Sequence, residues 1–336
     1  MNAQEIQYLK EFLSQPKQIT IIPHRNPDGD ALGSSLGLYH VLKQLHHNVT
    51  IVSPNEFPEF IAWLPASETV AIYEKNTTVC QNILSSSDLI FTLDFNAFHR
   101  TGDTMGNFLA TLTQPFVMID HHQMPDDYAK ITVSDTSFGS TCELLYNWIT
   151  ELDLQNYINK DAATCIYTGI VTDSGSFKFV KTTGATHRVV ADLIDRGVDN
   201  PAVHNALFST SSFNRLQLLG RALSHLKVFP EHKTAYTYLT QQDLYHFNFQ
   251  KGDTEGIVNY GLSIKGIDFA AIFIENKEEG IIKISFRSEG GFDVNEYSRN
   301  YFNGGGHINA AGGKSFSTLD ETIATFEKTL QLIDKK

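Results

Sequence analysis

Four segments of this 336-residue chain carry aspartate and histidine side chains at chemically useful spacings, and the first segment is the densest. Residues 21–37 read IIPHRNPDGDALGSSLG and hold His24, Asp28 and Asp30 within seven positions. Carboxylates crowded in this way repel each other and lose hydration unless a cation lies among them. The residue types therefore indicate a metal site in this loop.

The other segments place more acids and histidines after apolar runs: Asp94, Asp120, His121, His122 and Asp173. Ligands of open α/β sheets bind beyond the carboxyl ends of the strands, so we expect all four segments to meet at one rim of a sheet. A single aspartate at a strand end is more often a helix cap, so the prediction depends on the whole set. Carboxylate and imidazole ligands without thiolates suit Mn²⁺, Mg²⁺ or Fe²⁺ better than structural zinc.

Six of these side chains are candidate metal ligands: His24, Asp28, Asp30, Asp94, His121 and Asp173. Six ligands are enough for two octahedral ions when one carboxylate bridges the ions and water or substrate fills the remaining positions. Two cations roughly 3.5–4 Å apart commonly support in-line displacement at phosphorus, because they hold a hydroxide against the phosphate. The ligand set thus predicts a two-metal site that hydrolyses a phosphoester.

The elements that must position these residues alternate between strands and helices. Short apolar runs predict buried parallel strands at residues 19–24, 49–53, 89–95 and 116–120. Helices are predicted at residues 30–47, 139–153 and 161–173. This βαβ order predicts a doubly wound α/β domain with a parallel sheet over residues 1–188.

The sequence pattern changes after residue 188. Residues 189–226 predict a helical linker with a break at Pro201. Shorter strands follow, with a hairpin turn at residues 276–280. We then predict a helix, a glycine-rich loop and a closing amphipathic helix, at residues 294–303, 304–313 and 320–336. Residues 227–336 are therefore predicted to form a second, smaller α+β domain.

The composition limits the classes of partner and compartment. A formal net charge of −12 argues against a grip on long nucleic acid, which needs a broad basic surface, but it leaves short anionic ligands open. The three cysteines, Cys80, Cys142 and Cys165, are far apart and odd in number, so we expect buried thiols. No apolar run approaches the ~20 residues of a membrane span, and the polar N-terminus does not resemble a signal peptide, so a cytoplasmic protein is expected.

The chain resembles the DHH/DHHA1 phosphoesterase superfamily in five segments that follow the family's order: PHRNPDGDALGS, DFNAFHR, IDHH, TDSG and GGGHINAAGG. The resemblance covers nearly the whole chain. Its two-domain length is most similar to the subgroup of stand-alone oligoribonucleases (nanoRNases) and 3′-phosphoadenosine-5′-phosphate (pAp) phosphatases. The resemblance implies a metal-binding catalytic DHH domain over residues 1–188 and a substrate-binding DHHA1 domain over residues 227–336.

The resemblance also implies a role for each candidate ligand. One ion would be held by His24, Asp28 and Asp94. The second ion would be held by Asp30, Asp94, His121 and Asp173, so that Asp94 bridges the two ions and is a catalytic residue. The family typically prefers Mn²⁺, which agrees with the ligand types.

Further roles implied by the resemblance concern the substrate. His122 would face the scissile phosphate as a hydrogen-bond or proton donor, and its alternative role is to orient His121. Asp120 would support the ligand shell rather than bind metal. Arg100 would contact an anionic substrate, unless it is an ordinary surface arginine. In the second domain, the implied substrate-binding residues are Arg287, Gly304, Gly305, Gly306 and His307.

The expected activity is metal-dependent hydrolysis of short oligonucleotides to 5′-mononucleotides, removal of phosphate from pAp, or both. A cyclic or linear dinucleotide phosphodiesterase and an inorganic pyrophosphatase or exopolyphosphatase are the alternatives among enzymes. A nucleotide-binding regulatory protein is the alternative outside that class. The family also implies a possible homodimer. No membrane is expected as a partner because the apolar runs are too short, and no long nucleic acid is expected because of the net charge.

Overall fold

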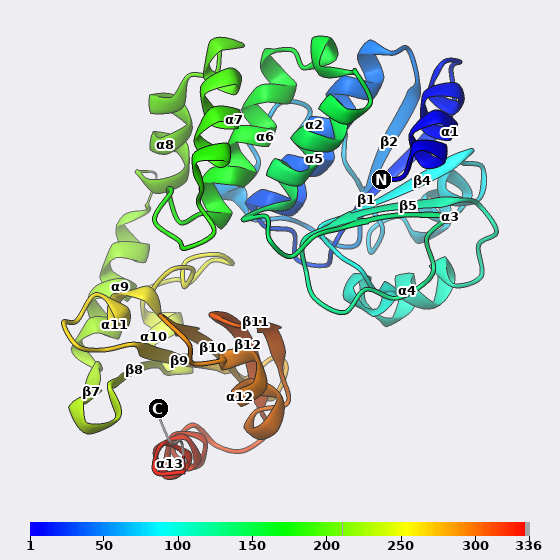
Figure 1. The fold of residues 1–336 in the computed structure, drawn as a ribbon. Helices are drawn as coiled ribbons and strands as arrows, with labels where there is room; N and C mark the ends of the chain where they lie inside the picture. The colour runs from blue at the N-terminus through cyan, green and yellow to red at the C-terminus, as the bar shows by residue number, and fades with distance from the viewer. Residues whose placement is uncertain (210, 333–336) are drawn as a thin grey trace. The chain divides into compact units, whose positions relative to one another are not determined.

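A computed structural model describes residues 1–209 and 211–332 of the chain. The chain divides into two units, Met1–Thr210 and Ser211–Lys336. The predicted helical linker, residues 189–226, extends across this division, and its boundaries stay a prediction. Each unit is built around one sheet (Figure 1).

The first unit contains a six-stranded sheet in the order β3-β2-β1-β4-β5-β6, and all its neighbouring strands are parallel. Its strands are β1 (Gln18–Pro23), β2 (Asn48–Ser53), β3 (Ala71–Ile72), β4 (Leu89–Leu93), β5 (Phe116–Asp120) and β6 (Ile131–Ser134). The four predicted strands correspond to β1, β2, β4 and β5. The predicted doubly wound α/β fold is therefore confirmed.

Helices cover both faces of this sheet. In β4, Phe91 packs with residues of α2, α5 and α6, whereas its neighbour Ile90 packs with Cys80 of α3 and Leu109 of α4. The helices are α1 (Ala3–Leu13), α2 (Gly29–Gln44), α3 (Thr77–Ser85), α4 (Asp103–Leu109), α5 (Thr141–Glu151), α6 (Lys160–Asp173), α7 (Gly184–Asp195) and α8 (Asn200–Phe208). Burial on both faces explains why the strands are continuously apolar.

Two glycines allow α2 and α6 to approach closely. A Cβ on Gly33 would lie 2.6 Å from the carbonyl oxygen of Cys165, and a Cβ on Gly169 would collide with Cys142 Sγ of α5 and lie 2.8 Å from Asp30 Oδ1. The close approach places Asp30, in the first turn of α2, against α6. Because Asp173 is the last residue of α6, the same packing brings Asp173 to the rim where α2 begins.

The second unit contains a mixed six-stranded sheet in the order β11-β12-β10-β9-β8-β7, in which β8 and β9 are parallel and the other pairs are antiparallel. The strands are β7 (Lys227–Phe229), β8 (Thr234–Leu239), β9 (Phe269–Asn276), β10 (Ile281–Ser288), β11 (Gly305–His307) and β12 (Ala310–Ser315). Its helices are α9 (Phe213–Ser224), α10 (Gln241–His246), α11 (Asn259–Leu262), α12 (Val294–Tyr301) and α13 (Leu319–Leu330). The predicted hairpin turn lies between β9 and β10, and the α+β class is confirmed.

The helical segment is interrupted near Pro201, as predicted, because α7 ends at Asp195 and α8 begins at Asn200. Pro201 itself lies in the first turn of α8, where its missing N–H has no intrahelical partner to lose. One prediction about local structure is wrong. The glycine-rich segment 304–313 is not a loop, because most of it forms the antiparallel β11–β12 pair. The predicted closing helix corresponds to α13, and its residues 333–336 lie outside the described residues.

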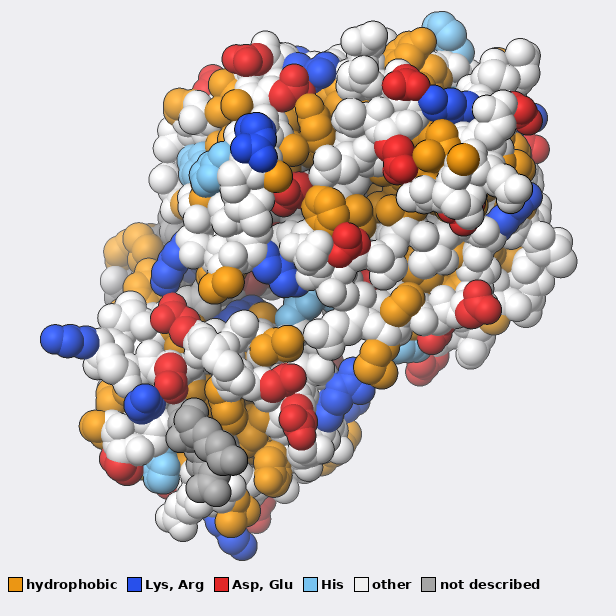
Figure 2. All heavy atoms as spheres, in the orientation of Figure 1, with side chains coloured by type: hydrophobic (Ala, Val, Ile, Leu, Met, Phe, Trp, Pro, Cys, Tyr) orange, Lys and Arg blue, Asp and Glu red, His pale blue; other side chains and the backbone are white. Residues whose placement is uncertain are grey.

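The distribution of surface charges and the burial of the cysteines agree with the predictions made from the composition. On the face drawn in Figure 2, the described Lys and Arg side chains are scattered among Asp and Glu side chains. The three cysteines are buried free thiols, as predicted. Within residues 1–209 and 211–332, none of the helices has both the length and the apolar character that a membrane span requires.

Candidate metal centre

The loop between β1 and α2 carries the first three predicted ligands. His24 follows β1 directly, Asp28 caps α2, and Asp30 lies in its first turn. Asp28 Oδ1 accepts the backbone N–H groups of Asp30 and Ala31, both at 3.0 Å. Asp28 Oδ2 faces His24 Nε2 at 3.8 Å. Asp28 can therefore cap the helix with one oxygen and offer the other to a metal.

An asparagine pair fixes the shape of this loop. Asn26 has a φ of +54°, and its backbone N–H donates to Asn55 Oδ1 at 2.7 Å. In return, Asn55 Nδ2 donates to Asn26 Oδ1 at 2.8 Å. Asn55 is buried directly after β2, and the sequence analysis did not identify it, because its partner is distant in the chain.

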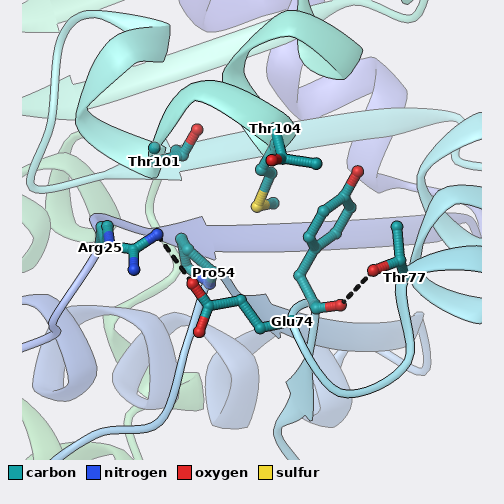
Figure 3. A pocket seen from close by; sticks show the side chains of 9 residues that line it. Arg25, Pro54, Glu74, Thr77, Thr101 and Thr104 are labelled. Atoms are coloured by element: carbon teal, nitrogen blue, oxygen red, sulfur yellow. Dashed lines mark hydrogen bonds and ion pairs between the residues drawn. The ribbon is translucent and has the colours of Figure 1, made fainter. Parts of the chain in front are cut away.

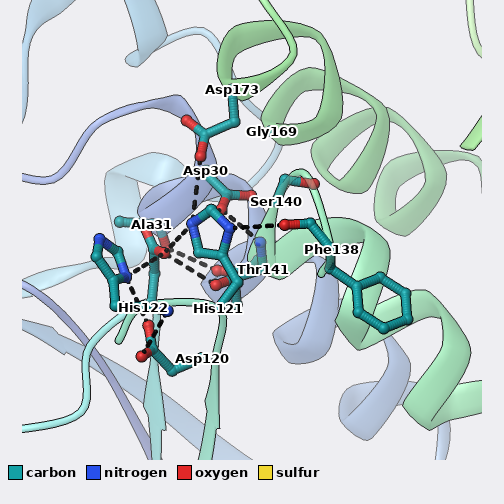
Figure 4. A network of polar contacts seen from close by, with 12 residues as sticks. Asp30, Ala31, Asp120, His121, His122, Phe138, Ser140, Thr141, Gly169 and Asp173 are labelled. Carbon is teal, nitrogen blue, oxygen red and sulfur yellow. Dashed lines mark hydrogen bonds and ion pairs between the residues drawn. The ribbon is translucent and has the colours of Figure 1, made fainter. Parts of the chain in front are cut away.

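Both predicted histidine ligands turn Nε2 toward carboxylates. His24 Nδ1 donates to the Arg25 carbonyl at 2.8 Å, and His121 Nδ1 donates to the Phe138 carbonyl at 3.3 Å (Figure 4). A carbonyl oxygen can only accept, so Nδ1 carries a proton in each ring. Nε2 is then the atom through which each ring would bind a metal, in the arrangement usual for histidine ligands.

Asp94 lies between the two histidines. It follows β4 with a left-handed φ of +63°, a conformation that costs a non-glycine residue about 1–3 kcal/mol and that clusters at functional sites. Its Oδ2 lies 3.4 Å from His24 Nε2, and its Oδ1 lies 3.5 Å from His121 Nε2. One carboxylate thus faces a different histidine with each oxygen.

His121 lies close to the carboxylates of Asp173 and Asp30. His121 Nε2 lies 3.4 Å from Asp173 Oδ2 and 3.8 Å from Asp30 Oδ2 (Figure 4). Two groups that consist only of predicted ligands, with ligand atoms within 4.8 Å of one another, share Asp94: His24, Asp28 and Asp94, and Asp30, Asp94 and His121. The structure therefore brings all six predicted ligands together at one rim of the sheet. Their assignment as metal ligands stays a proposal.

Excess negative charge shapes the protonation of this site. Burial, and then the charges of Asp94 and Asp28, raise the pKa of Asp30 well above its usual value. Burial also raises the pKa of Asp173. Burial opposes the charged form of His24, but its hydrogen bond with Asp94 and the charge of Asp28 raise its pKa to about 9. A divalent cation would neutralise such a set, so the donor chemistry fits a metal.

The pKa of Asp94 moves in the opposite direction. Burial opposes its ionisation, but the hydrogen bond with His24, followed by the electrostatic interactions with His122, His24 and His121, holds its pKa well below the usual value. Asp94 is thus an ionised carboxylate at the centre of the site, even though only 2 % of its side chain is exposed. A central carboxylate with a lowered pKa is suited to bridge two cations.

Asp120 and Arg100 hold His122 from opposite sides. His122 Nδ1 donates to Asp120 Oδ1 at 2.7 Å, and its backbone N–H donates to Asp120 Oδ2 at 3.0 Å. Arg100, in the 3₁₀ helix η3 (Phe98–Thr101), donates from Nη2 to His122 Nε2 at 3.1 Å. Asp94, Asp120 and His122 also satisfy the distance for a metal group, but both Asp120 oxygens already accept hydrogen bonds from His122.

The N-terminus of α5 contributes contacts that the sequence analysis missed. The backbone N–H groups of Thr141 and Cys142 donate to the two oxygens of Asp30, at 2.6 and 2.9 Å. The Thr141 hydroxyl donates to Asp94 Oδ1 at 2.9 Å. Ser140 is a recognisable helix cap in the sequence, but no local pattern indicates which carboxylates that helix will face.

A row of residues on the second sheet includes Arg287 and His307. Arg287 of β10 pairs with Ala310 of β12, and Ala310 pairs with His307 of β11. Directly opposed residues of antiparallel strands point to the same face, so Arg287 and His307 flank the small Ala310 side chain, roughly 10 Å apart across two strand spacings. The neighbouring row, with buried Phe286 and Ala311, faces the core formed with α12 and α13.

The predicted glycines have separate structural roles in this hairpin. Gly306 has a φ of +153°, and its backbone N–H donates to Asn295 Oδ1 at 2.9 Å. That N–H is therefore engaged within the unit rather than pointing at a ligand. A Cβ on Gly304 would collide with the Gly312 carbonyl and the Ser298 hydroxyl, so this glycine permits the hairpin to pack on α12. Gly305 lies opposite Gly312 in the pair.

A cavity of about 230 Å³ lies beside the first loop, between Arg25 and the start of α4 (Figure 3). Its lining includes Tyr73, Thr101 and Met105. The Arg25 guanidinium, which is the only Lys or Arg group among the lining residues, pairs with Glu74 at 2.8 Å. The cavity therefore offers a balanced pair of charges rather than a cationic site.

Comparisons with known proteins agree with these motifs. Residues 18–170 match the DHH family, N-terminal domain, and residues 232–332 match the DHHA1 domain. A "bifunctional oligoribonuclease and PAP phosphatase NrnA" from Thermus thermophilus is 29% identical over 316 residues, which cover 94% of this chain and 89% of the relative. A Bacillus subtilis protein of the same name is 29% identical over 313 residues, 92% of this chain and 94% of that protein.

The match with one solved structure extends over both units of the chain. The crystal structure of an exopolyphosphatase-related protein from Bacteroides fragilis has 36% sequence identity and a TM-score of 0.95, and the match covers 98% of this chain and 96% of that one. Identity at this level over nearly the full length of both chains shows common ancestry as well as a common fold. The chain therefore belongs to the DHH family and joins a DHH domain to a DHHA1 domain.

Proposed function

We propose that this protein is a metal-dependent phosphoesterase that hydrolyses short oligonucleotides to 5′-mononucleotides and removes a phosphate from pAp. The observation that carries the proposal is that two groups of predicted ligands, one with His24 and Asp28 and the other with Asp30 and His121, share Asp94. The pair fits two neighbouring divalent cations, for which Mn²⁺ is our first candidate and Mg²⁺ or Fe²⁺ are alternatives. When bound, such ions lower the pKa of water and offset the charge of a phosphate.

The chain's own residues would position the reacting groups. Asp120 fixes the His122 ring through Nδ1 and so turns Nε2 toward Arg100. Arg100 now donates to Nε2, which accepts through its lone pair; an incoming phosphate would accept from the Arg100 guanidinium, and from His122 Nε2 once that nitrogen has taken up a proton. We therefore assign His122 and Arg100 to the scissile phosphate. Asp120 acts by orienting His122.

The relatives' names support the substrate class. Two relatives of similar length are named as bifunctional oligoribonucleases and PAP phosphatases, and both substrates are short and anionic. The row formed by Arg287, Ala310 and His307 offers two nitrogen donors around a small residue, which suits a terminal phosphate. The net charge of −12 favours short ligands over long nucleic acid.

The test is product release by the purified chain with Mn²⁺, with Mg²⁺ and with EDTA. The substrates are the dinucleotide pApA, pAp, a cyclic dinucleotide and inorganic pyrophosphate. We expect AMP from pApA and phosphate from pAp, both abolished by EDTA. The Asp94→Asn variant should lose at least about 100-fold in kcat, because even the partners of metal ligands contribute 10–100-fold.

Each other outcome points to a different function. Turnover of pyrophosphate alone would contradict the proposed substrate and favour a pyrophosphatase. Hydrolysis of cyclic dinucleotides in preference to pApA would favour a dinucleotide phosphodiesterase. Nucleotide and metal binding without any product would indicate a regulatory binding protein.

A further inference from the structure

Thr141 lies outside the predicted ligand set and donates hydrogen bonds to two of its carboxylates. Its backbone N–H donates to Asp30 Oδ2 at 2.6 Å, and its hydroxyl donates to Asp94 Oδ1 at 2.9 Å. Asp30 belongs to the group that it forms with Asp94 and His121. Asp94 belongs to that group and also to the group with His24 and Asp28. Figure 4 shows Thr141 beside Asp30 and His121 in this network.

The hydroxyl is not required by the helix that carries it. Thr141 is the first residue of α5, and the cap of this helix is Ser140, whose Oγ accepts the Glu143 N–H at 3.0 Å. Thr141 is fully buried, so its hydroxyl has no water to bond instead. Asp94 is the hydrogen-bond acceptor of that hydroxyl in the structure. The polar group of Thr141 therefore serves the carboxylate rather than the helix.

The position of the hydroxyl determines how the Asp94 carboxylate is turned. Oδ1 accepts the bond from Thr141 and lies 3.5 Å from His121 Nε2, while Oδ2 lies 3.4 Å from His24 Nε2. A rotation about the last side-chain bond would break the bond to Thr141 and would turn both oxygens away from the two histidines. Terminal bonds of aspartate rotate broadly unless a partner fixes them.

We propose that Thr141 is a positioning residue of the metal centre, whose hydroxyl holds the Asp94 carboxylate in the orientation that bridges two ions. This inference rests on the proposed two-metal site. The backbone of α5 holds Asp30 through the N–H groups of Thr141 and Cys142, so a change of the Thr141 side chain leaves that contact in place. Substitution of the side chain therefore acts on Asp94 alone.

The experiment is a Mn²⁺ titration followed by electron paramagnetic resonance, in which free Mn²⁺ gives a six-line signal that is lost on binding. Thr141→Val keeps the shape of the side chain and removes the donor. We expect the variant to bind the second of its two Mn²⁺ ions, the one that binds last in the titration, 10–100-fold more weakly than the wild type does. This is the range seen for groups that orient metal ligands. Thr141→Ser keeps the hydroxyl and should stay within about threefold of the wild type.

A matched control is Thr168→Val. Thr168 is also fully buried in the first unit, but its hydroxyl donates only to the Thr164 carbonyl, within its own helix, at 2.8 Å. The same chemical change there should leave Mn²⁺ affinity unaltered. If Thr141→Val does not fold, the comparison of Thr141→Ser with Thr141→Ala isolates the hydroxyl, and the serine should bind the second ion at least 10-fold more tightly.

The outcomes separate this inference from the proposed function. A wild-type chain that binds two Mn²⁺ ions, together with a Thr141→Val variant of equal affinity, would overturn the inference alone. Equal losses in Thr141→Ser and Thr141→Ala would also overturn it, because the methyl group rather than the hydroxyl would then matter. A wild-type chain that binds no Mn²⁺ would overturn both the inference and the proposed metal site.

Discussion

The raised pKa of His24 predicts that the metal-free protein loses stability as the pH rises. The folded-state pKa of about 9 lies above the ordinary value of 6.5, so the stabilising contribution of His24 is complete below pH 6.5 and is lost as the pH rises through 9. Each pKa unit corresponds to about 1.4 kcal/mol, so the free energy of unfolding should fall by about 3 kcal/mol between these limits. Its partners are Asp94, at 3.4 Å, and Asp28, at 3.8 Å.

The assay is urea unfolding in EDTA at pH 6.5 and pH 9, followed by tryptophan fluorescence. Both tryptophans, Trp63 and Trp148, lie in the first unit, so the signal reports on the unit that holds His24. His24→Gln should remove most of the difference between the two pH values. His187→Gln, which changes an exposed histidine of α7, is the control and should retain that difference.

Saturating Mn²⁺ should reverse the trend, because a metal competes with the proton on His24 Nε2 and binds more tightly at higher pH. The bound ion should also add stability at fixed pH through mass action. A metal-free wild type whose free energy of unfolding stays constant or rises between pH 6.5 and pH 9 would refute the reasoning. An equal pH dependence in His24→Gln would refute the assignment to this residue.

Three further predictions concern single substitutions. Asp120→Asn should lower kcat on pApA by about 10–100-fold with little change in KM, because the amide offers one acceptor where the His122 ring and backbone now use two. Gly169→Ala should lower the free energy of unfolding by about 1–3 kcal/mol, measured by urea denaturation, because its Cβ would collide with Cys142 Sγ and lie 2.8 Å from Asp30 Oδ1. Arg287→Gln should raise KM for pAp by about 10-fold or more while kcat is retained, because a bond to a charged group is worth about 1.5–3 kcal/mol.

Each of these substitutions has an outcome that contradicts its premise. A change in KM alone for Asp120→Asn would mean that the residue supports binding and not the orientation of His122. An unchanged free energy of unfolding for Gly169→Ala would show that the helices packed around Gly169 can move apart without loss of stability. An unchanged KM for Arg287→Gln would remove Arg287 from the substrate site, and Lys283→Gln, an exposed change on the same strand, is the matched control.

The rim of the first sheet could be predicted because each segment carries its own signal. A buried strand that ends at Asp120, or directly before His24 or Asp94, places that residue at the carboxyl end of a parallel sheet, whichever strands are its neighbours. The strands β3 and β6 were missed because two and four residues are too short for a hydrophobic pattern. The site could still be predicted without these two strands, because they lie at the edges of the sheet.

The contacts that orient the ligands could not be predicted from local patterns. Thr141 and Asn55 reach the site from segments that fold against it, and both are ordinary residues in sequence. The glycine-rich segment was predicted as a loop because glycine disfavours strands, but its close packing on α12 requires glycine at Gly304. Tertiary packing decided all three cases.

The most direct test of the central claim is a crystal structure of the wild-type chain grown with Mn²⁺, with anomalous diffraction data that locate the metal. The account predicts two anomalous peaks roughly 3.5–4 Å apart. It also predicts that the Asp94 carboxylate contacts both peaks, that His24 contacts one and that His121 contacts the other. A single peak, or two peaks without Asp94 between them, would contradict the account.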